Sequence, residues 1–169
     1  MFRWLLLAAL ALSTPALSES LLGALWFAVN DGVMGGVSEG RVATTDGVMV
    51  FEGRVSLENN GGFASARREV SALAGGALHL RVRGDGRRYR ITASPEARGG
   101  TQYSAAFNAP AGQWVELALA LADFRASFRG RPLPDAPPLA PSAVRAVGFI
   151  IGEGQSGTFR LEVGALQAR

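Results

Sequence analysis

Alternation between apolar and polar residues runs through most of the chain and predicts β-strands. In the stretch ALHLRVR, residues 77–83, Leu78, Leu80 and Val82 alternate strictly with polar residues. Side chains along a strand point to opposite faces in turn, so such a stretch offers an apolar face to a core and a polar face to solvent. The stretch RRYRITAS, residues 87–94, alternates in the same way.

Glycine and proline turns separate the predicted strands, which are 47–57, 62–70, 77–83, 87–94, 101–109, 113–120, 144–152 and 157–166. We expect the third and fourth strands to pair as a hairpin around the turn GDG, and the fifth and sixth to pair as a second hairpin. The proline-rich segment 123–141 is expected to be an extended loop. No amphipathic helix longer than a turn or two is evident, so the predicted fold is an all-β sandwich of two antiparallel sheets with little helix.

The N-terminal segment 1–18 has the pattern of a bacterial export signal. A positively charged residue precedes an apolar run over residues 4–12, and small residues lead to Ser18. This order is typical of a cleavable signal peptide, and the apolar run is short for a membrane span. We therefore expect export to the periplasm with cleavage near Ser18; a retained N-terminal anchor is the alternative. Residues 19–169 then form a single domain.

Composition and charge exclude several classes of function. The chain has no cysteine, which excludes disulfides and thiolate metal sites. Its 17 basic residues, all arginine, face 14 acidic ones, for a net charge of +3. A charge this close to balance does not indicate nucleic-acid binding. The only histidine, His79, lies mid-strand with an arginine on the same face, and we interpret it as a structural or surface residue.

The segment WFAVNDGVMGGVSEG, residues 26–40, contains four glycines. A phosphate-binding glycine loop precedes a helix, whose N-terminus supplies N–H groups, but strand-like residues follow this segment. Two interpretations remain. The segment is a tight loop in which Asp31 and Ser38 cap backbone N–H groups, or a recognition loop in which Gly35 and Gly36 let a partner approach.

Carboxylates in glycine turns are further candidates for chemistry. They are Asp31, Asp46, Asp85 and Glu153. An acidic side chain in such a turn most often bonds its own backbone, so we predict no metal site, although Ca²⁺ would use the same oxygens. An enzyme that uses Asp31 or Asp85 is one functional option, and it predicts a polar cleft with an abnormal carboxylate. The option we prefer has no catalysis and no cofactor.

Four arginines share the polar face of the first expected hairpin: Arg81, Arg83, Arg88 and Arg90. They either pair with carboxylates such as Glu116 or Glu162, or bind an acidic partner, a polysaccharide or a lipid headgroup. The aromatic residues Trp26, Tyr89 and Trp114 are expected in the core rather than on a sugar-stacking surface.

Three ordered motifs, NDGVMGGVS at 30–38, NNGGFASAR at 59–67 and RGDGRRYR at 83–90, resemble the complex I intermediate-associated protein 30 family. The resemblance extends over nearly all of the chain after the export signal. It implies a galactose-binding-like jelly-roll sandwich, in agreement with the strand pattern. It also implies a non-catalytic assembly factor for respiratory complex I, with complex I subunits or assembly intermediates as protein partners.

We therefore predict a protein-binding domain whose contact surface combines the loops 30–38 and 60–67. The residues expected on the functional surface are Asn30, Asp31, Met34, Gly35, Gly36, Ser38, Asn60, Gly61, Gly62, Phe63, Arg67, Arg81, Arg83, Asp85, Arg87 and Tyr89. No nucleic acid is expected, and any membrane contact is peripheral. The alternative function is an exported carbohydrate-binding module on the polar face of the sandwich, which requires at least two exposed aromatics on one face.

Overall fold

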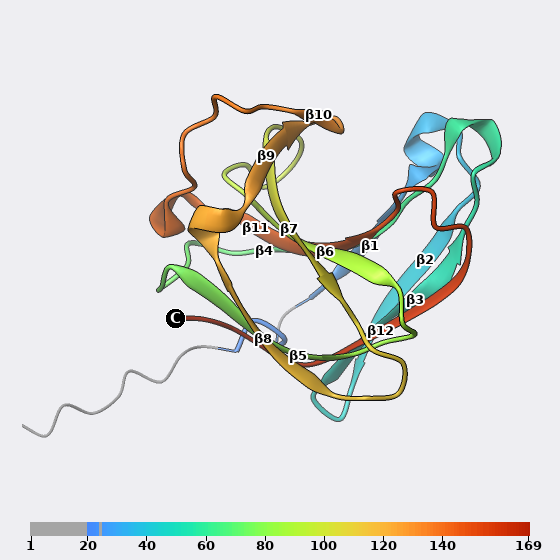
Figure 1. The fold of residues 1–169 in the computed structure, drawn as a ribbon, viewed down its shortest axis with the longest axis horizontal. Helices are drawn as coiled ribbons and strands as arrows, with labels where there is room; N and C mark the ends of the chain where they lie inside the picture. The colour runs from blue at the N-terminus through green and yellow to red at the C-terminus, as the bar shows by residue number, and fades with distance from the viewer. Residues whose placement is uncertain (1–19, 24) are drawn as a thin grey trace, which may run out of the picture.

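The alternating stretches form two antiparallel sheets packed face to face in the computed structural model, which describes residues 20–23 and 25–169 (Figure 1). The expected export signal, residues 1–18, lies outside the described residues. Helix in the described part of the chain is limited to short 3-10 helices, namely η1 (Asp31–Met34), η2 (Glu58–Asn60), η3 (Leu121–Asp123) and η4 (Pro141–Ala143). The predicted all-β sandwich is confirmed.

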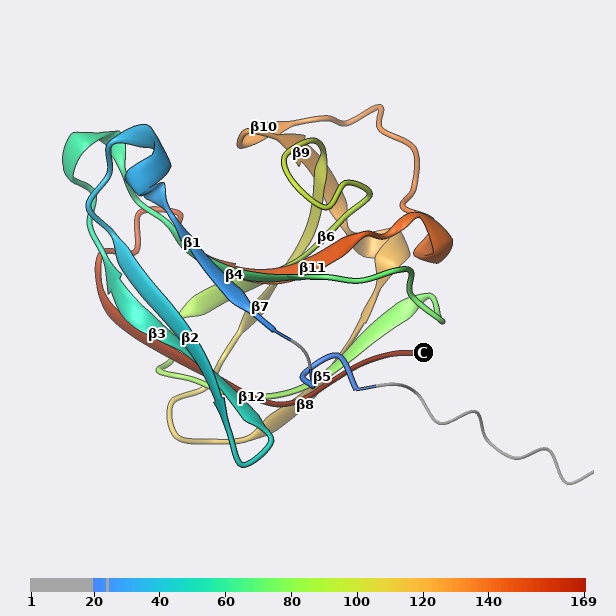
Figure 2. The ribbon, with the colours of Figure 1, turned by 180° about the vertical axis from the view of Figure 1, so that it is seen from behind.

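The first sheet has seven strands and curves around the core (Figure 2). Across the sheet its strands are β1 (Phe27–Asn30), β4 (Ala64–Glu69), β11 (Ala146–Ile151), β6 (Arg88–Ser94), β7 (Gln102–Asn108), β9 (Arg125–Phe128) and β10 (Arg131–Pro132). The expectation of an extended loop over 123–141 was therefore wrong in part, because β9 and β10 lie within it.

The second sheet has five strands. In order they are β2 (Glu39–Thr45), β3 (Val48–Val55), β12 (Gly157–Ala168), β5 (Ala77–Arg83) and β8 (Val115–Ala120). β12 is central and pairs with β3 on one side and with β5 on the other, with a register shift between Val163 and Ala165. No helix among the described residues is long and apolar enough to cross a membrane.

Both predicted hairpins were wrong. β5 and β6 belong to different sheets, and so do β7 and β8. The GDG turn is a corner between the sheets, where Gly84 N–H donates to the Pro110 carbonyl and Gly86 N–H donates to the Ala109 carbonyl. Alternation was still correct within each strand, because strands on opposite sides of one core both point apolar side chains inward. The predicted arginine face is consequently divided between two outer surfaces.

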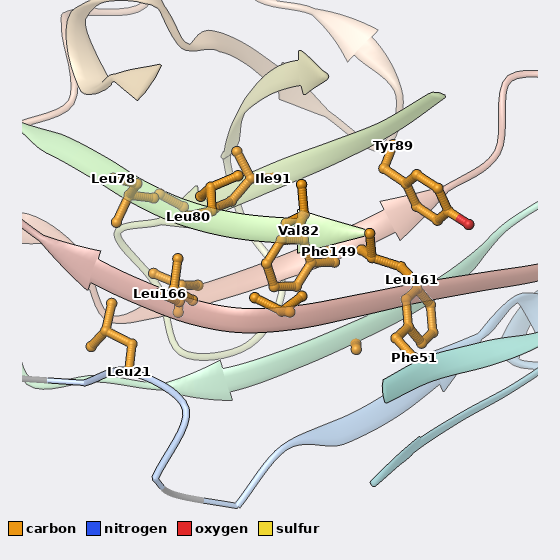
Figure 3. Close-up of a cluster of buried hydrophobic side chains, with 14 of the residues drawn as sticks. Leu21, Phe51, Leu78, Leu80, Val82, Tyr89, Ile91, Phe149, Leu161 and Leu166 are labelled. Atoms are coloured by element: carbon orange, nitrogen blue, oxygen red, sulfur yellow. The ribbon is translucent and has the colours of Figure 1, made fainter. Parts of the chain in front are cut away.

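The core fills the space between the sheets with alternating side chains from both (Figure 3). Its largest fully buried members are Tyr89, Phe51, Phe149, Met49, Leu78, Ile91, Ile151, Leu161, Leu166, Val55, Val82 and Val144. Trp26 stacks on Phe149 with ring centroids 5.7 Å apart, as expected of a core residue. Packing of this kind fixes the strands that carry the loops described next.

Candidate functional site

Asp31 joins the two glycine-rich loops through its carboxylate, which is 0 % exposed. Oδ1 accepts a hydrogen bond from the Ser38 N–H at 2.9 Å. Oδ2 accepts from the Ser38 hydroxyl at 2.6 Å, from the Gly62 N–H at 2.6 Å and from the Phe63 N–H at 3.3 Å. Residues more than thirty positions apart in sequence are thus held by one charged group. We call these four residues the Asp31 cluster.

The Asp31 carboxylate stays ionised inside the cluster. Burial alone would raise its pKa, but the hydrogen bonds from Ser38, Gly62 and Phe63 outweigh burial and hold the pKa below its ordinary value of 3.8. Both oxygens are occupied by loop donors, so the side chain presents nothing to a substrate. This geometry argues against an enzyme that uses Asp31.

Two glycines next to the cluster make room for the carboxylate. A Cβ at Gly36 would lie 2.3 Å from Asp31 Cγ, and a Cβ at Gly61 would lie 2.6 Å from Asp31 Oδ2. Gly35 has a φ of 88° and turns the chain at the end of η1. The surroundings of Gly36 and Ser38 therefore fit the first interpretation of the glycine run, a tight loop that Asp31 caps.

Asn30 lies beside the cluster and lines a hollow. Its Nδ2 donates to the Gly40 carbonyl at 3.2 Å, while its buried Oδ1 has no hydrogen-bond partner. The hollow has a volume of about 630 Å³, and Gly53, Arg54 and Thr158 are among the other residues that line it. Asn30 is therefore the first residue of the motif and also part of a surface depression.

Five large apolar side chains are exposed along β1, just before it, or next to η1 and η2. Leu25 is 78 % exposed, Phe27 54 % and Val29 36 %, all in or next to β1. Val37 is 49 % exposed between η1 and β2, and Leu57 is 50 % exposed before η2. Figure 2 shows η1 and η2 side by side, with β1 leading into η1. We call these five residues the apolar rim. The sequence analysis missed them, because alternation and loop motifs do not show which apolar side chains of a sheet edge stay exposed.

The remaining loop residues of the prediction lie near the cluster but differ in environment. Met34 is the last residue of η1, and Asn60 is exposed in η2 with a φ of 59°. Phe63 is half-buried. The Arg67 guanidinium donates to the Ala97 carbonyl, and burial lowers its pKa. The structure thus brings the predicted 30–38 and 60–67 loops together.

The GDG corner is built around Asp85. Its Oδ1 accepts from the Arg87 N–H at 3.1 Å and from the Tyr89 hydroxyl at 3.0 Å, and its Oδ2 accepts from the Arg160 N–H at 2.9 Å. Burial and the neighbouring Asp85 charge raise the pKa of Tyr89, which keeps its hydroxyl as a donor. The Asp85 carboxylate therefore uses both oxygens to connect the GDG turn to β6 and β12.

The arginines of the predicted polar face pair mostly with carboxylates. On the five-stranded sheet a row of ion pairs crosses four strands: Arg41–Glu52 at 2.5 Å, Arg160–Glu52, Arg160–Glu162 at 2.8 Å and Arg83–Glu162. Hydrogen bonds from Arg41 and Arg83 lower the pKa values of Glu52 and Glu162 respectively. On the seven-stranded sheet Arg88 and Arg90 both pair with Glu153. The pairing interpretation holds for Arg83, Arg88 and Arg90.

Trp114 was predicted in the core, and that prediction was wrong. The indole is partly exposed on the outer face of the five-stranded sheet, with the guanidinium carbons of Arg81 and Arg83 at 4.6 Å and 4.8 Å from its ring. A Cβ at Gly164 would lie 3.2 Å from the indole, so this glycine leaves the space that the ring occupies. Trp114 is in phase with the exposed Glu116 of β8, so the prediction failed because it relied on the general tendency of large aromatic residues to be buried.

The predicted residues therefore do not form one surface. Arg81 and Arg83 lie with Trp114, Asp85 and Arg87 hold the GDG corner, and Tyr89 is buried in the core. Across residues 20–23 and 25–169, no group of three or more His, Cys, Asp or Glu side chains is placed to hold a metal ion.

Comparison with known families gives one match over most of the chain. Residues 17–163 match the model of the family described as complex I intermediate-associated protein 30. No curated protein matches the chain in sequence.

Comparison of structures points to the same fold. A family 11 carbohydrate-binding module from Clostridium thermocellum, solved in complex with a β-1,3-1,4-mixed-linked tetrasaccharide, has a TM-score of 0.61 and 12 % identity, covering 89 % of this chain and 93 % of that one. The agarase AgWH50C has a TM-score of 0.55 and 13 % identity, covering 85 % of this chain but 22 % of the agarase. At these identities the likeness establishes the galactose-binding-like jelly-roll sandwich.

Proposed function

Because this chain belongs to the complex I intermediate-associated protein 30 family, we propose that it is a non-catalytic, protein-binding domain that acts as an assembly factor. Its partners are proposed to be complex I subunits or assembly intermediates. The export pattern of residues 1–18 places the domain on the periplasmic side of the membrane in this proposal.

The observation that carries the proposal is the apolar rim. Monomeric proteins seldom gather exposed large apolar residues around one feature, and such patches mark interaction sites. Two rim residues, Val37 and Leu57, lie in the loops that the Asp31 cluster holds in place, so a partner meets a surface that is partly preformed and the ordering cost that opposes binding is reduced. Burial of one exposed Phe or Leu side chain contributes about 1.5–3 kcal/mol.

A carbohydrate-binding function is the alternative, and Trp114 is the observation that favours it. A partly exposed indole on a sheet face is able to stack on a sugar ring. The requirement of two exposed aromatics on one face is not met by the described strands, however. Phe27 in β1 and Phe128 in β9 lie near opposite edges of the seven-stranded sheet, too far apart to stack on one sugar chain segment, and Trp114 lies on the other sheet. Protein binding is therefore the function that we propose first.

The test is a cross-linked pull-down of C-terminally tagged protein from the native host, with the bound molecules identified by mass spectrometry. The wild-type chain should recover complex I subunits or assembly intermediates. The double variant Phe27→Ser, Leu57→Ser should lose them, because it removes apolar area from the rim. Trp114→Ala is the matched control and should keep them, since its ring lies on the other sheet.

Two results would contradict the proposal. One is recovery of the same proteins by the rim variant as by the wild type. The other is recovery of glycan that Trp114→Ala abolishes, which would establish the alternative. The same sample gives the mature N-terminus, and a first residue near Glu19 is expected if residues 1–18 are an export signal.

A further inference from the structure

β9 and β10 form a tight hairpin at the far edge of the seven-stranded sheet from β1. Phe128 pairs with Arg131 and Ser127 with Pro132, so only Arg129 and Gly130 make the turn. Figures 1 and 2 both show β9 and β10 beyond β7, at the end of the seven-stranded sheet that lies away from β1. β10 ends the sheet, and its outer edge carries a proline that blunts further strand pairing.

Apolar side chains are exposed at this hairpin. Phe128 is 43 % exposed, and Leu133, which directly follows β10, is 37 % exposed. Every other large apolar residue found exposed in the described chain belongs to the apolar rim beside β1. The hairpin is therefore a second apolar surface, separated from the rim by the width of the sheet.

Three exposed arginines accompany these two side chains: Arg125, Arg129 and Arg131. Within the described residues, no carboxylate lies at ion-pair distance from any of them. The Arg129 guanidinium carbon is 5.4 Å from the Phe128 ring centroid. The arginines of the five-stranded ion-pair row are neutralised by Glu52 and Glu162, whereas those of the hairpin keep their charge available.

The turn holds Arg129 in a conformation that the residue does not favour. Its φ is 48°, followed by 78° at Gly130, a pattern for which Asn-Gly is the preferred sequence. Asp46, Asn59 and Asn60 also have positive φ and are types that tolerate this region, whereas Glu153, with a φ of 58°, shares the unfavourable conformation of Arg129. The turn itself does not favour arginine at this position, and the Arg129 side chain is exposed and available for contact with another molecule.

We propose that the β9–β10 hairpin binds an anionic membrane surface. Phe128 and Leu133 enter the headgroup region, and Arg125, Arg129 and Arg131 contact lipid phosphates. Arginine matches phosphate geometry through two parallel hydrogen bonds, and apolar side chains need to enter a bilayer by only about 5–10 Å for interfacial binding.

The size of the hairpin favours a membrane over an acidic protein. A specific protein interface buries about 800 Å² on each partner, which a two-residue turn and two flanking side chains do not offer. A membrane accepts a projecting tip without shape complementarity, and its anionic charge is spread over the whole surface. This inference does not depend on the proposed protein partner, because the rim and the hairpin lie at opposite edges of the sheet.

The expected contribution of the arginines to membrane affinity follows from their number. Each arginine held near an anionic lipid surface strengthens binding about fivefold, so removal of all three weakens it about a hundredfold. The electrostatic part should weaken with salt, because the charges are exposed. Loss of the Phe128 ring should weaken binding further by about tenfold.

The test is co-sedimentation of the protein as the host produces it with vesicles of phosphatidylcholine, with or without phosphatidylglycerol. We expect binding that requires phosphatidylglycerol, falls as salt is added, and drops about fivefold in Arg129→Gln. Arg54→Gln is the matched control, since Arg54 is also exposed and without an ion pair but lies on the other sheet. Phe128→Ser should bind more weakly at every salt concentration.

Several outcomes would overturn the inference. Equal binding to vesicles without phosphatidylglycerol would indicate that a retained apolar N-terminal segment, and not the hairpin, holds the chain. Equal losses in Arg54→Gln and Arg129→Gln would indicate a general effect of net charge. Binding to soluble polyglutamate as tight as to vesicles would indicate an acidic protein partner. Thermal unfolding of each variant separates these outcomes from misfolding, which a surface substitution should not cause.

Discussion

Replacement of Asp31 by asparagine should lower the free energy of unfolding by about 3 kcal/mol, although the two side chains have nearly the same shape. In the native fold the carboxylate accepts from three backbone N–H groups and one hydroxyl. An amide has one acceptor oxygen and one donor nitrogen. Whichever way it is turned, the nitrogen faces at least one N–H that needs an acceptor, either that of Ser38 or those of Gly62 and Phe63.

The magnitude comes from two losses and one gain. A buried N–H left without an acceptor costs about 1–3 kcal/mol, and each hydrogen bond that loses its charged acceptor weakens by about 1 kcal/mol. Relief from burying a charge offsets part of the sum, which leaves a net loss of about 3 kcal/mol. Against a typical total stability of about 5–15 kcal/mol, this is a large fraction.

Urea unfolding followed by circular dichroism measures the effect directly. The matched control is Asp46→Asn, an exposed turn residue whose φ of 52° asparagine tolerates well, and it should stay within about 0.5 kcal/mol of wild type. If Asp31→Asn also stays within about 0.5 kcal/mol, the hydrogen bonds of the Asp31 cluster do not stabilise the loops and the reasoning is refuted.

The pH dependence gives a second check on the same group. The pKa of Asp31 is lower in the folded chain than its ordinary value of 3.8. A depressed carboxyl pKa contributes stability that is complete above the unfolded-state pKa and is lost as pH falls through the folded-state pKa. The difference in unfolding free energy between wild type and Asp31→Asn should therefore be constant near neutral pH and shrink below about pH 4.

Three further substitutions test neighbouring parts of the structure by the same unfolding assay. Gly36→Ala should cost about 2–4 kcal/mol because its Cβ meets the Asp31 carboxylate, whereas Gly32→Ala, with nothing within 4 Å, should cost less than about 1 kcal/mol. Tyr89→Phe should cost about 1 kcal/mol by removing one donor to Asp85; no change would mean that the GDG corner does not need that bond. Trp114→Ala should lower the free energy of unfolding by about 1–2 kcal/mol. A loss of about 3–5 kcal/mol would instead indicate that the indole is buried in the core.

Alternation predicted where strands lie but not which strands pair. The residues of β5 and β6 both alternate because both line the same core, and this pattern is identical for a hairpin and for two strands in opposing sheets. The distinction depends on Gly84 and Gly86, whose N–H groups bond Pro110 and Ala109 at the corner. Those partners lie more than twenty residues away, so no local pattern contains them.

The sequence predicted the residues of both loops, but it did not predict that Asp31 joins the two loops. Asp31 and Ser38 were expected to cap backbone N–H groups, and Ser38 N–H does bond Asp31. The bonds from Gly62 and Phe63 to the same carboxylate join the ends of β1 and β4, neighbouring strands that are more than thirty residues apart in sequence, so sequence spacing carries no information on them. Arg129 went unnoticed for the opposite reason, since a proline-rich context predicts a loop even where a hairpin forms.

The motif residues and the proposed partner surface, the apolar rim, are different residues. Asp31, Gly36 and Gly62 are committed to holding two loops together, and the geometry leaves them no free group for another molecule. Val37 and Leu57 lie between these fixed positions with their side chains exposed. A chain that keeps the cluster can therefore exchange its rim residues without disturbing the frame. Matching the motif then identifies the scaffold of the domain, whereas under the proposed function the rim determines which partner the scaffold binds.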